Sequence, residues 1–144
     1  DLGADLVVDY TQQDFAEAVE GWTDGSGVDV VLDVVGGDYL AKNLQCVKVQ
    51  GRIVQVGVMG GPMASFALGA LLPKRASLIG TVLRSRPIEQ KIEANQRFVA
   101  ELLPRFDDGS LQPVIDSRFS IDEISEAHVY MDTNANIGKI LIDI

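Results

Sequence analysis

Two glycine pairs and two arginines are the residues of this sequence best suited to bind a ligand. Gly36-Gly37 and Gly60-Gly61 each follow an apolar, strand-like run, and Arg84 and Arg86 follow a third. Glycine lets a backbone approach a flat ligand closely, and arginine binds anions. The pattern indicates an anionic ligand with a planar part, although glycine after a strand is also ordinary turn chemistry.

The two common phosphate-binding motifs are absent. Gly25-Ser26-Gly27 precedes an apolar run instead of following one, and Val30 occupies the third glycine position of G-x-G-x-x-G. Gly138-Lys139 lacks the upstream glycine and the following hydroxyl residue of a nucleoside triphosphate loop. The first motif is therefore interpreted as a turn, and the second does not mark a triphosphate site.

Single residues with reactive side chains favour structural roles. His128 has no Ser or Cys partner in the sequence pattern, so a packed or surface histidine is favoured over a catalytic base. Cys46 has only Lys48 nearby, which favours a buried, inert thiol over a nucleophile. Asp33 is expected to cap or to face solvent rather than contact a ligand, while Tyr10 suits a stacking role and the edge of the core equally. We assign no catalytic residue and no metal ligand.

Composition narrows the class of protein. The 144 residues are 47% hydrophobic and 23% charged, which suits one globular domain or part of one. A net charge of −9 disfavours nucleic acid and anionic membranes as partners, and no apolar run reaches the ~20 residues of a membrane span. A single cysteine fits a cytoplasmic protein. Because the chain opens on Asp1 without a targeting pattern, we expect a piece of a longer chain.

Strand-like runs alternate with segments of helical spacing. Strands are predicted over residues 6–10, 28–35, 52–58, 77–83 and 140–144. Helices are predicted over residues 12–21, 38–47, 68–72, 87–106 and from 121 to about 131. Thr11 and Asp38 are the expected caps of the first two helices, and Ser120 with Glu123 forms a capping box before the last. This alternation predicts an α/β fold, in which helices cover both faces of a parallel sheet.

The order of these segments resembles the medium-chain dehydrogenase/reductase superfamily. The resemblance covers essentially the whole chain and rests on Gly3-Ala4-Asp5, Asp9-Tyr10, the run from Gly27 to Gly37, Gly51-Arg52-Ile53-Val54 and Asn136-Ile137-Gly138-Lys139-Ile140. Leu83-Arg84-Ser85-Arg86-Pro87 narrows it to the zinc-independent NADPH:quinone oxidoreductases related to zeta-crystallin, in particular the p53-inducible type.

The resemblance implies a partial Rossmann fold. The doubly wound parallel sheet would lack its first two strands and their glycine-rich phosphate turn, and a short return segment of the substrate domain would follow it. Residues 1–110 would belong to the dinucleotide-binding domain and residues 111–144 to the return segment. The missing strands would lie between the first strand here and the strand that begins at Val28, so we expect self-association, strand exchange or rearrangement.

The resemblance also implies where a cofactor would bind. Tyr10 would lie near the adenosine phosphate and Val34 along the adenine–ribose side, while Gly57 and Val58 would pass the nicotinamide. The remaining implied contacts are backbone positions near the carboxamide and one carboxyl-terminal residue, namely Leu83, Arg84, Ser85 and Asn134. We further expect Arg84 to position an anionic part of the cofactor.

The implied activity is hydride transfer from NADPH to a quinone or an α,β-unsaturated carbonyl, without zinc. The implied assembly is a homodimer joined through the edge strand from Ser77 to Leu83, and this chain alone is expected to be inactive. Three alternatives stay open: an enoyl reductase of the same superfamily, including those within polyketide synthases, a non-catalytic nucleotide-binding or dimerising module, and an α/β domain without a ligand.

Overall fold

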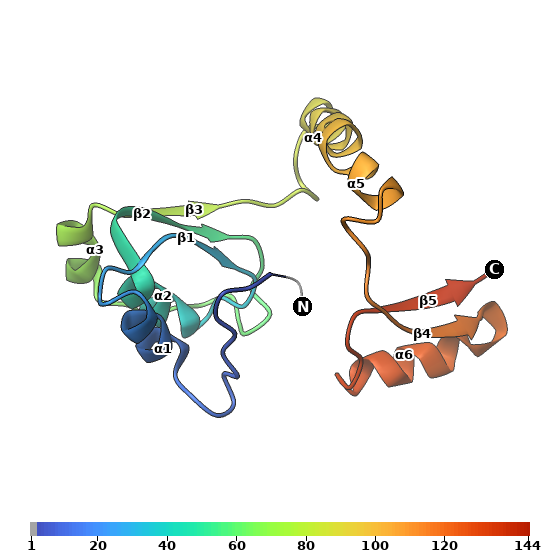
Figure 1. Cartoon of the computed structure of the whole chain (residues 1–144), viewed down its shortest axis with the longest axis horizontal. Helices are drawn as coiled ribbons and strands as arrows, with labels where there is room; N and C mark the ends of the chain where they lie inside the picture. The colour runs from blue at the N-terminus through green and yellow to red at the C-terminus, as the bar shows by residue number, and fades with distance from the viewer. Residues whose placement is uncertain (1–2) are drawn as a thin grey trace. The chain divides into compact units, whose positions relative to one another are not determined.

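The computed structural model describes residues 3–144, which form two compact units (Figure 1). The first unit ends at Arg86 and the second spans Pro87–Ile144. The first contains α1 (Phe15–Trp22), β1 (Val28–Asp33), α2 (Tyr39–Cys46), β2 (Val47–Gln55), α3 (Leu68–Lys74) and β3 (Ser77–Gly80). The second contains α4 (Ile88–Glu101), α5 (Leu103–Asp107), β4 (Ile115–Ser120), the 3-10 turn η1 (Ile121–Glu123), α6 (Ile124–Asp132) and β5 (Lys139–Asp143).

The predicted α/β class with parallel strands is confirmed. In the first unit β2 lies between β1 and β3 and pairs in parallel with both strands. In the second unit β4 pairs in parallel with β5. Parallel pairing places the carboxyl ends of β1, β2 and β3 at one edge of their sheet, where the glycine pairs follow them.

The core of the first unit lies between one face of this sheet and its helices. Val31 and Ile53 are paired neighbours on β1 and β2, and Ile53 is fully buried. Leu40 and Leu44 of α2, with Phe66 and Leu71, pack against this row. Val47 and Ile53 of β2 are both completely removed from water and form the centre of this core.

The opposite face of the same sheet is exposed within the first unit. Leu32 of β1 is 69% exposed and Ile79 of β3 is 43% exposed. Both residues are aligned with Val54 of β2, so they form one row across the sheet. The expectation of helices on both faces is thus met on one face of this unit alone.

Helix α1 is docked on α2 by aromatic and charged contacts. The rings of Phe15 and Tyr39 lie 5.1 Å apart, and Lys42 Nζ lies 2.8 Å from the carboxylate of Asp14. Asp14 also accepts the backbone N–H of Ala16 at 2.8 Å, which makes it the N-cap. The expected cap at Thr11 is wrong, because the Thr11 hydroxyl instead donates to Asp9 at 2.6 Å.

Residues 6–10 do not form the strand predicted from their apolar sequence. No ladder partner for them exists among residues 3–144, and Val7 is 78% exposed. A β-strand is stable only when its backbone groups pair with a neighbour and one face is buried. Residues 6–10 have neither a paired neighbour nor a buried face, so this apolar run remains irregular. A gap in the sheet between this segment and β1, as expected, would leave the run in that state.

Several strand boundaries and one helix cap differ from their predictions. The strand predicted over 52–58 is β2, which starts at Val47 because that residue already pairs with Val28. The predicted cap Asp38 has αR backbone geometry and makes no capping hydrogen bond through its side chain. The strands predicted over 28–35 and 77–83 end earlier, at Asp33 and Gly80, because loops begin there.

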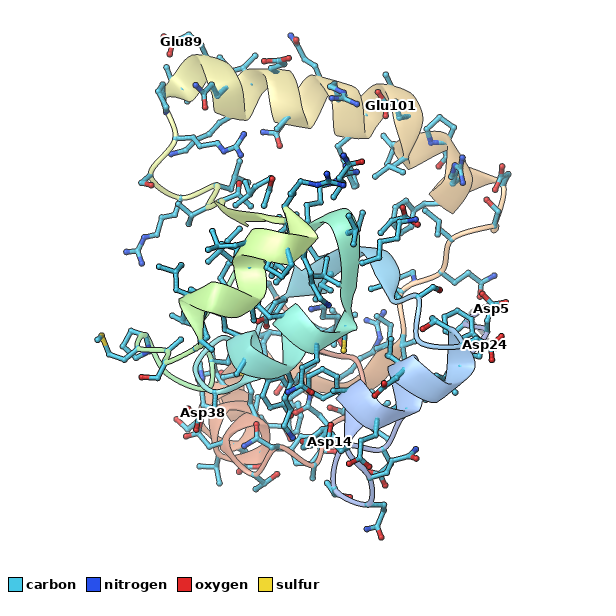
Figure 2. The ribbon with its side chains drawn as sticks, turned by 90° about the vertical axis from the view of Figure 1, so that its left-hand side faces the viewer. Asp5, Asp14, Asp24, Asp38, Glu89 and Glu101 are labelled. Atoms are coloured by element: carbon cyan, nitrogen blue, oxygen red, sulfur yellow. The ribbon has the colours of Figure 1, made fainter. Side chains whose placement is uncertain are left out.

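The long helix predicted over 87–106 is divided into α4 and α5. Pro104 lies in the first turn of α5, and proline lacks the N–H that a continuous helix needs. Leu102 stands between the two helices as the C-cap of α4 and the N-cap of α5. Figure 2 shows Glu89 and Glu101 toward the two ends of α4, and Glu101 pairs with Arg97 at 3.1 Å.

The second unit contains the predicted capping box. The carboxylate of Glu123 accepts the Ser120 backbone N–H at 2.9 Å, and this bond lowers the pKa of Glu123. Helix α6 follows and lies along β5. The boundary after residue 110, which assigns segments to the domains of a longer protein, stays a proposal. Among residues 3–144 no helix has the length and apolar character needed to cross a membrane.

Candidate functional site

The candidate site is the edge at which the three parallel strands of the first unit end. Asp33, Gln55 and Gly80 are aligned across β1, β2 and β3. The next backbone amides continue the pairing, since Val56 N–H donates to Asp33 O at 2.8 Å and Thr81 N–H donates to Gln55 O at 2.9 Å. Three loops therefore leave the sheet side by side.

Two of these loops, residues 34–37 and 57–61, are hydrogen-bonded along their backbones. Gly60 N–H donates to Val35 O at 2.7 Å, and Met59 N–H donates to Val34 O at 3.3 Å. We call this pair of loops the double glycine loop. Its two chains are as close as neighbouring strands, although neither has strand conformation.

Glycine is required in the double glycine loop by space and by backbone conformation. Gly37 has a φ of +56°, and a Cβ at this position would lie 2.8 Å from Gly60 O. A Cβ at Gly57 would lie 2.8 Å from Val34 O. A methyl group at either position would force the loops apart, so the glycines explain why the backbones can approach each other.

Side chains behind the double glycine loop tie it to the sheet. The Gln55 amide donates to Asp33 O at 3.2 Å and to Gly57 O at 2.6 Å, so it links the ends of β1 and β2. The Asp33 carboxylate accepts the N–H groups of Val35 and Gly36. Asp33 is therefore a buried cap of its own loop, in line with the favoured sequence interpretation.

Two open cavities lie beside the double glycine loop, of about 490 and about 430 Å³. They share Val56, Thr81 and Val82, and the predicted residues Gly57 and Val58 line the larger one. The smaller cavity is bordered by Leu83 and by Arg86, whose guanidinium donates to Thr81 Oγ1 at 2.6 Å. The surroundings are apolar except for the ends of Gln55, Thr81 and Arg86.

The structure brings together four of the eight predicted cofactor residues, namely Val34, Gly57, Val58 and Leu83. Arg84 and Ser85 lie in the exposed turn between Leu83 and Arg86. Tyr10 is 71% exposed in a turn, and no hydrogen bond joins it to the double glycine loop among the described residues. Asn134 belongs to the second unit and has a φ of +55°. The assignment of all eight residues as cofactor contacts stays a prediction.

Sequence reasoning missed four of the residues that line the cavities. Gln55, Val56, Thr81 and Val82 were not named as candidates, although all four occupy the edge that the strand ends define. Gln55 carried a usable signal, because it is a polar residue between Val54 and Val56 in an apolar run.

The described residues do not offer a zinc site. No group of three or more His, Cys, Asp or Glu side chains in residues 3–144 could hold a metal ion. Cys46 is buried, and burial raises the pKa of its thiol, which lowers its reactivity. No step of the reaction proposed below is assigned to zinc.

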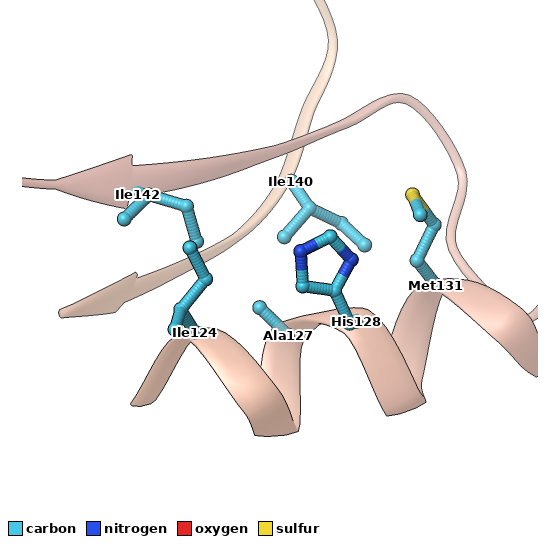
Figure 3. A pocket seen from close by; sticks show the side chains of 6 residues that line it. All are labelled: Ile124, Ala127, His128, Met131, Ile140 and Ile142. Carbon is cyan, nitrogen blue, oxygen red and sulfur yellow. The ribbon is translucent and has the colours of Figure 1, made fainter. Parts of the chain in front are cut away.

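His128 lies at a separate, apolar cavity in the second unit. This cavity of about 140 Å³ lies between α6 and β5, and Figure 3 shows the His128 ring beside Ile140 and Met131. The other lining residues are Ile124, Ala127 and Ile142. His128 itself is exposed. Because the lining holds no second polar side chain to exchange a proton with the ring, the geometry agrees with a surface histidine rather than a catalytic base.

Comparison with known proteins identifies the family. Residues 2–142 match the family model described as zinc-binding dehydrogenase, so the chain belongs to that family. The sequence resemblance to quinone oxidoreductases of the medium-chain dehydrogenase/reductase superfamily is thereby confirmed.

Two relatives and one solved structure agree with this family assignment. Quinone oxidoreductase-like protein 2 of Bos taurus is 32% identical over 99% of this chain and 40% of its own length. A 2-haloacrylate reductase of a Burkholderia species is 32% identical over 98% of this chain and 42% of its own length. The structure of a quinone oxidoreductase from Pseudomonas syringae is 27% identical, with a TM-score of 0.70 over 94% of this chain and 42% of that one. The chain thus spans about two fifths of these proteins.

A methyl group at Gly37 is expected to disrupt the double glycine loop. Gly37→Ala should lower the free energy of unfolding by more than about 1 kcal/mol, since alanine is strained at positive φ and contacts the opposite backbone. Gly69→Ala is the matched control, because a Cβ there has open space and the helix favours alanine. Urea unfolding of the two variants measures the difference, and equal stabilities would contradict this account of the loop.

Proposed function

We propose that this chain supplies the cofactor-binding edge of an oxidoreductase that transfers hydride from NADPH to a quinone or an α,β-unsaturated carbonyl. The observation that carries the proposal is the double glycine loop beside two open cavities, at the edge where three parallel strands end. Ligands of open parallel sheets bind outside this edge. Membership of a dehydrogenase family supplies the chemical class.

The residues present fit a nicotinamide dinucleotide. The glycines let the two loops pack closely beside the larger cavity, and Val56, Val58 and Val82 give that cavity an apolar lining suited to a flat ring. Arg84 lies beyond the end of β3 and adds a positive charge in a chain of net charge −9. An anionic ligand with a planar part would find both kinds of surface along one edge.

In this proposal the chain binds and orients the cofactor. When bound, the nicotinamide supplies the hydride, and the protein supplies position and polarity. Gly57 and Val58 would pass its ring, while the backbone at Leu83 and Ser85 would lie near its carboxamide. Arg84 would position an anionic part, and Val34 would lie along the adenine–ribose side. Tyr10 and Asn134 would add the two outer contacts, and no acid or base is assigned to this chain.

The names of the relatives support the substrate class. Two of these proteins carry the name of a quinone oxidoreductase or a protein like one, and the third is named a 2-haloacrylate reductase. Quinones and haloacrylates both contain a carbon–carbon double bond conjugated to a carbonyl group, and such electron-poor bonds accept hydride. We therefore extend a quinone or enone acceptor to this protein. Enoyl thioesters contain the same conjugated bond and are the rival substrates.

Turnover by the natural protein that contains this chain tests the proposal. We expect NADPH to be oxidised with benzoquinone or an enone faster than with NADH or with an enoyl thioester, as followed by loss of reduced nicotinamide absorbance. Gly37→Ala should slow the reaction and Gly69→Ala should not. The rate should also survive a metal chelator. Absence of turnover with both cofactors, or a preference for enoyl thioesters, would contradict the proposal.

We also propose a homodimer joined through β3. This strand is an edge of the three-stranded sheet, and Leu78 and Ile79 are both more than two fifths exposed. An unpaired edge is a template for pairing with a second chain. Ile79→Lys should shift the chain from dimer to monomer in size-exclusion chromatography with light scattering. Leu32→Lys, in the same row on the opposite edge, should not, and the reverse result would place the interface elsewhere.

A further inference from the structure

The most deeply buried charge of the first unit lies directly behind the double glycine loop. Asp33 is only 4% exposed, and none of the ion pairs among residues 3–144 includes it. An ionised carboxylate is stable in such a place only when hydrogen-bond donors satisfy its oxygens. The groups that donate hydrogen bonds to the Asp33 carboxylate therefore indicate its structural role.

All three hydrogen bonds to the Asp33 carboxylate come from the loop and from α2. One carboxylate oxygen, Oδ1, accepts the N–H of Val35 at 2.6 Å and that of Gly36 at 2.9 Å. The other, Oδ2, accepts the side-chain amide of Asn43 at 2.7 Å, and Asn43 is itself buried. Asp33 thus joins the end of β1, the following loop and the middle of α2 at one point.

This arrangement fixes the loop without using any group that would face a ligand. The N–H groups of Val35 and Gly36 are occupied by Asp33, so they are not donors to a bound cofactor. The hydrogen bonds of these two N–H groups to Asp33 instead determine the path of the backbone between Val34 and Gly37. Gly60 and Met59 then bond to the carbonyls of this path, so its position is passed on to the second half of the double glycine loop.

We propose that Asp33, held by Asn43, is a positioning residue for the nicotinamide cofactor. The proposal rests on the proposed function above. Hydrogen bonds to a charged acceptor are stronger than neutral ones, so the carboxylate holds the loop in one geometry before the cofactor arrives. A side chain at position 33 that residue 43 no longer holds would lose its fixed orientation and leave the loop to sample other paths, and binding would then include the cost of ordering the loop.

A charge swap separates this role from a general effect on folding. Asp33→Asn removes the charge and turns an amide donor toward the amide of Asn43. Its cofactor dissociation constant should rise about tenfold, the size expected for a lost charge-assisted hydrogen bond. In D33N/N43D the new amide at position 33 donates to the new carboxylate at 43 and still offers an oxygen to Val35 and Gly36. Affinity should return to within about threefold of the parent.

A control at the other end of α2 measures the effect of lost stability alone. Lys74 donates to the carbonyls of Gln45 and Val47, at the end of the helix remote from Asp33. Lys74→Met should lower the free energy of unfolding without changing the dissociation constant. Asn43→Ser, which keeps the contacts between Asp33 and the loop, serves if Asp33→Asn does not fold, and its constant should rise about threefold.

The measurements are calorimetric titration with NADPH and amide hydrogen exchange of Val35 and Gly36. We expect faster exchange at both amides and weaker binding in Asp33→Asn, with recovery of both in the double variant. An unchanged dissociation constant in folded Asp33→Asn, or an equal rise in Lys74→Met, would overturn the positioning role. If the parent binds neither NADPH nor NADH, the proposed function fails and this role falls with it, while exchange still reports whether Asp33 orders the loop.

Discussion

The parallel pairing of β1, β2 and β3 is the constraint on which the site depends. Because all three strands point the same way, their last residues Asp33, Gln55 and Gly80 are aligned and their loops start from one edge. An antiparallel arrangement of any strand would send one loop to the opposite side of the sheet. Every later feature, including the double glycine loop and the cavities beside it, follows from this common direction.

The apolar core and the buried polar network perform different tasks in the same unit. Ile53 and Val47 hold α2 and α3 against one face of the sheet through burial alone, which fixes the elements but not the loops. The loops are fixed by directional hydrogen bonds: Asp33 accepts loop N–H groups and is held by Asn43, and Gln55 donates to Gly57 O. Close packing of glycine backbone then sets their separation. A ligand edge built in this way has its geometry determined before a ligand binds.

Sequence alone predicted most of the order of elements and the common edge at which the parallel strands end, because both depend on local patterns. Strand-like runs and the Ser120 capping box need no knowledge of distant contacts. It failed where a distant partner or its absence decides the outcome. Residues 6–10 have strand composition but no neighbour, and Gln55 became important through contacts with two separate loops. The helical period predicted over 87–106 continues past Pro104, but the proline begins a second helix there.

The central claim is that the edge formed by the double glycine loop and residues 81–85 binds a nicotinamide dinucleotide. Amide chemical-shift mapping of this chain during titration with NADPH tests it most directly. The account predicts saturable shifts concentrated at Val34, Gly37, Gly57, Val58 and Leu83, with little change along α6. Saturable shifts centred on the cavity of His128, or no shifts at millimolar NADPH, would contradict it.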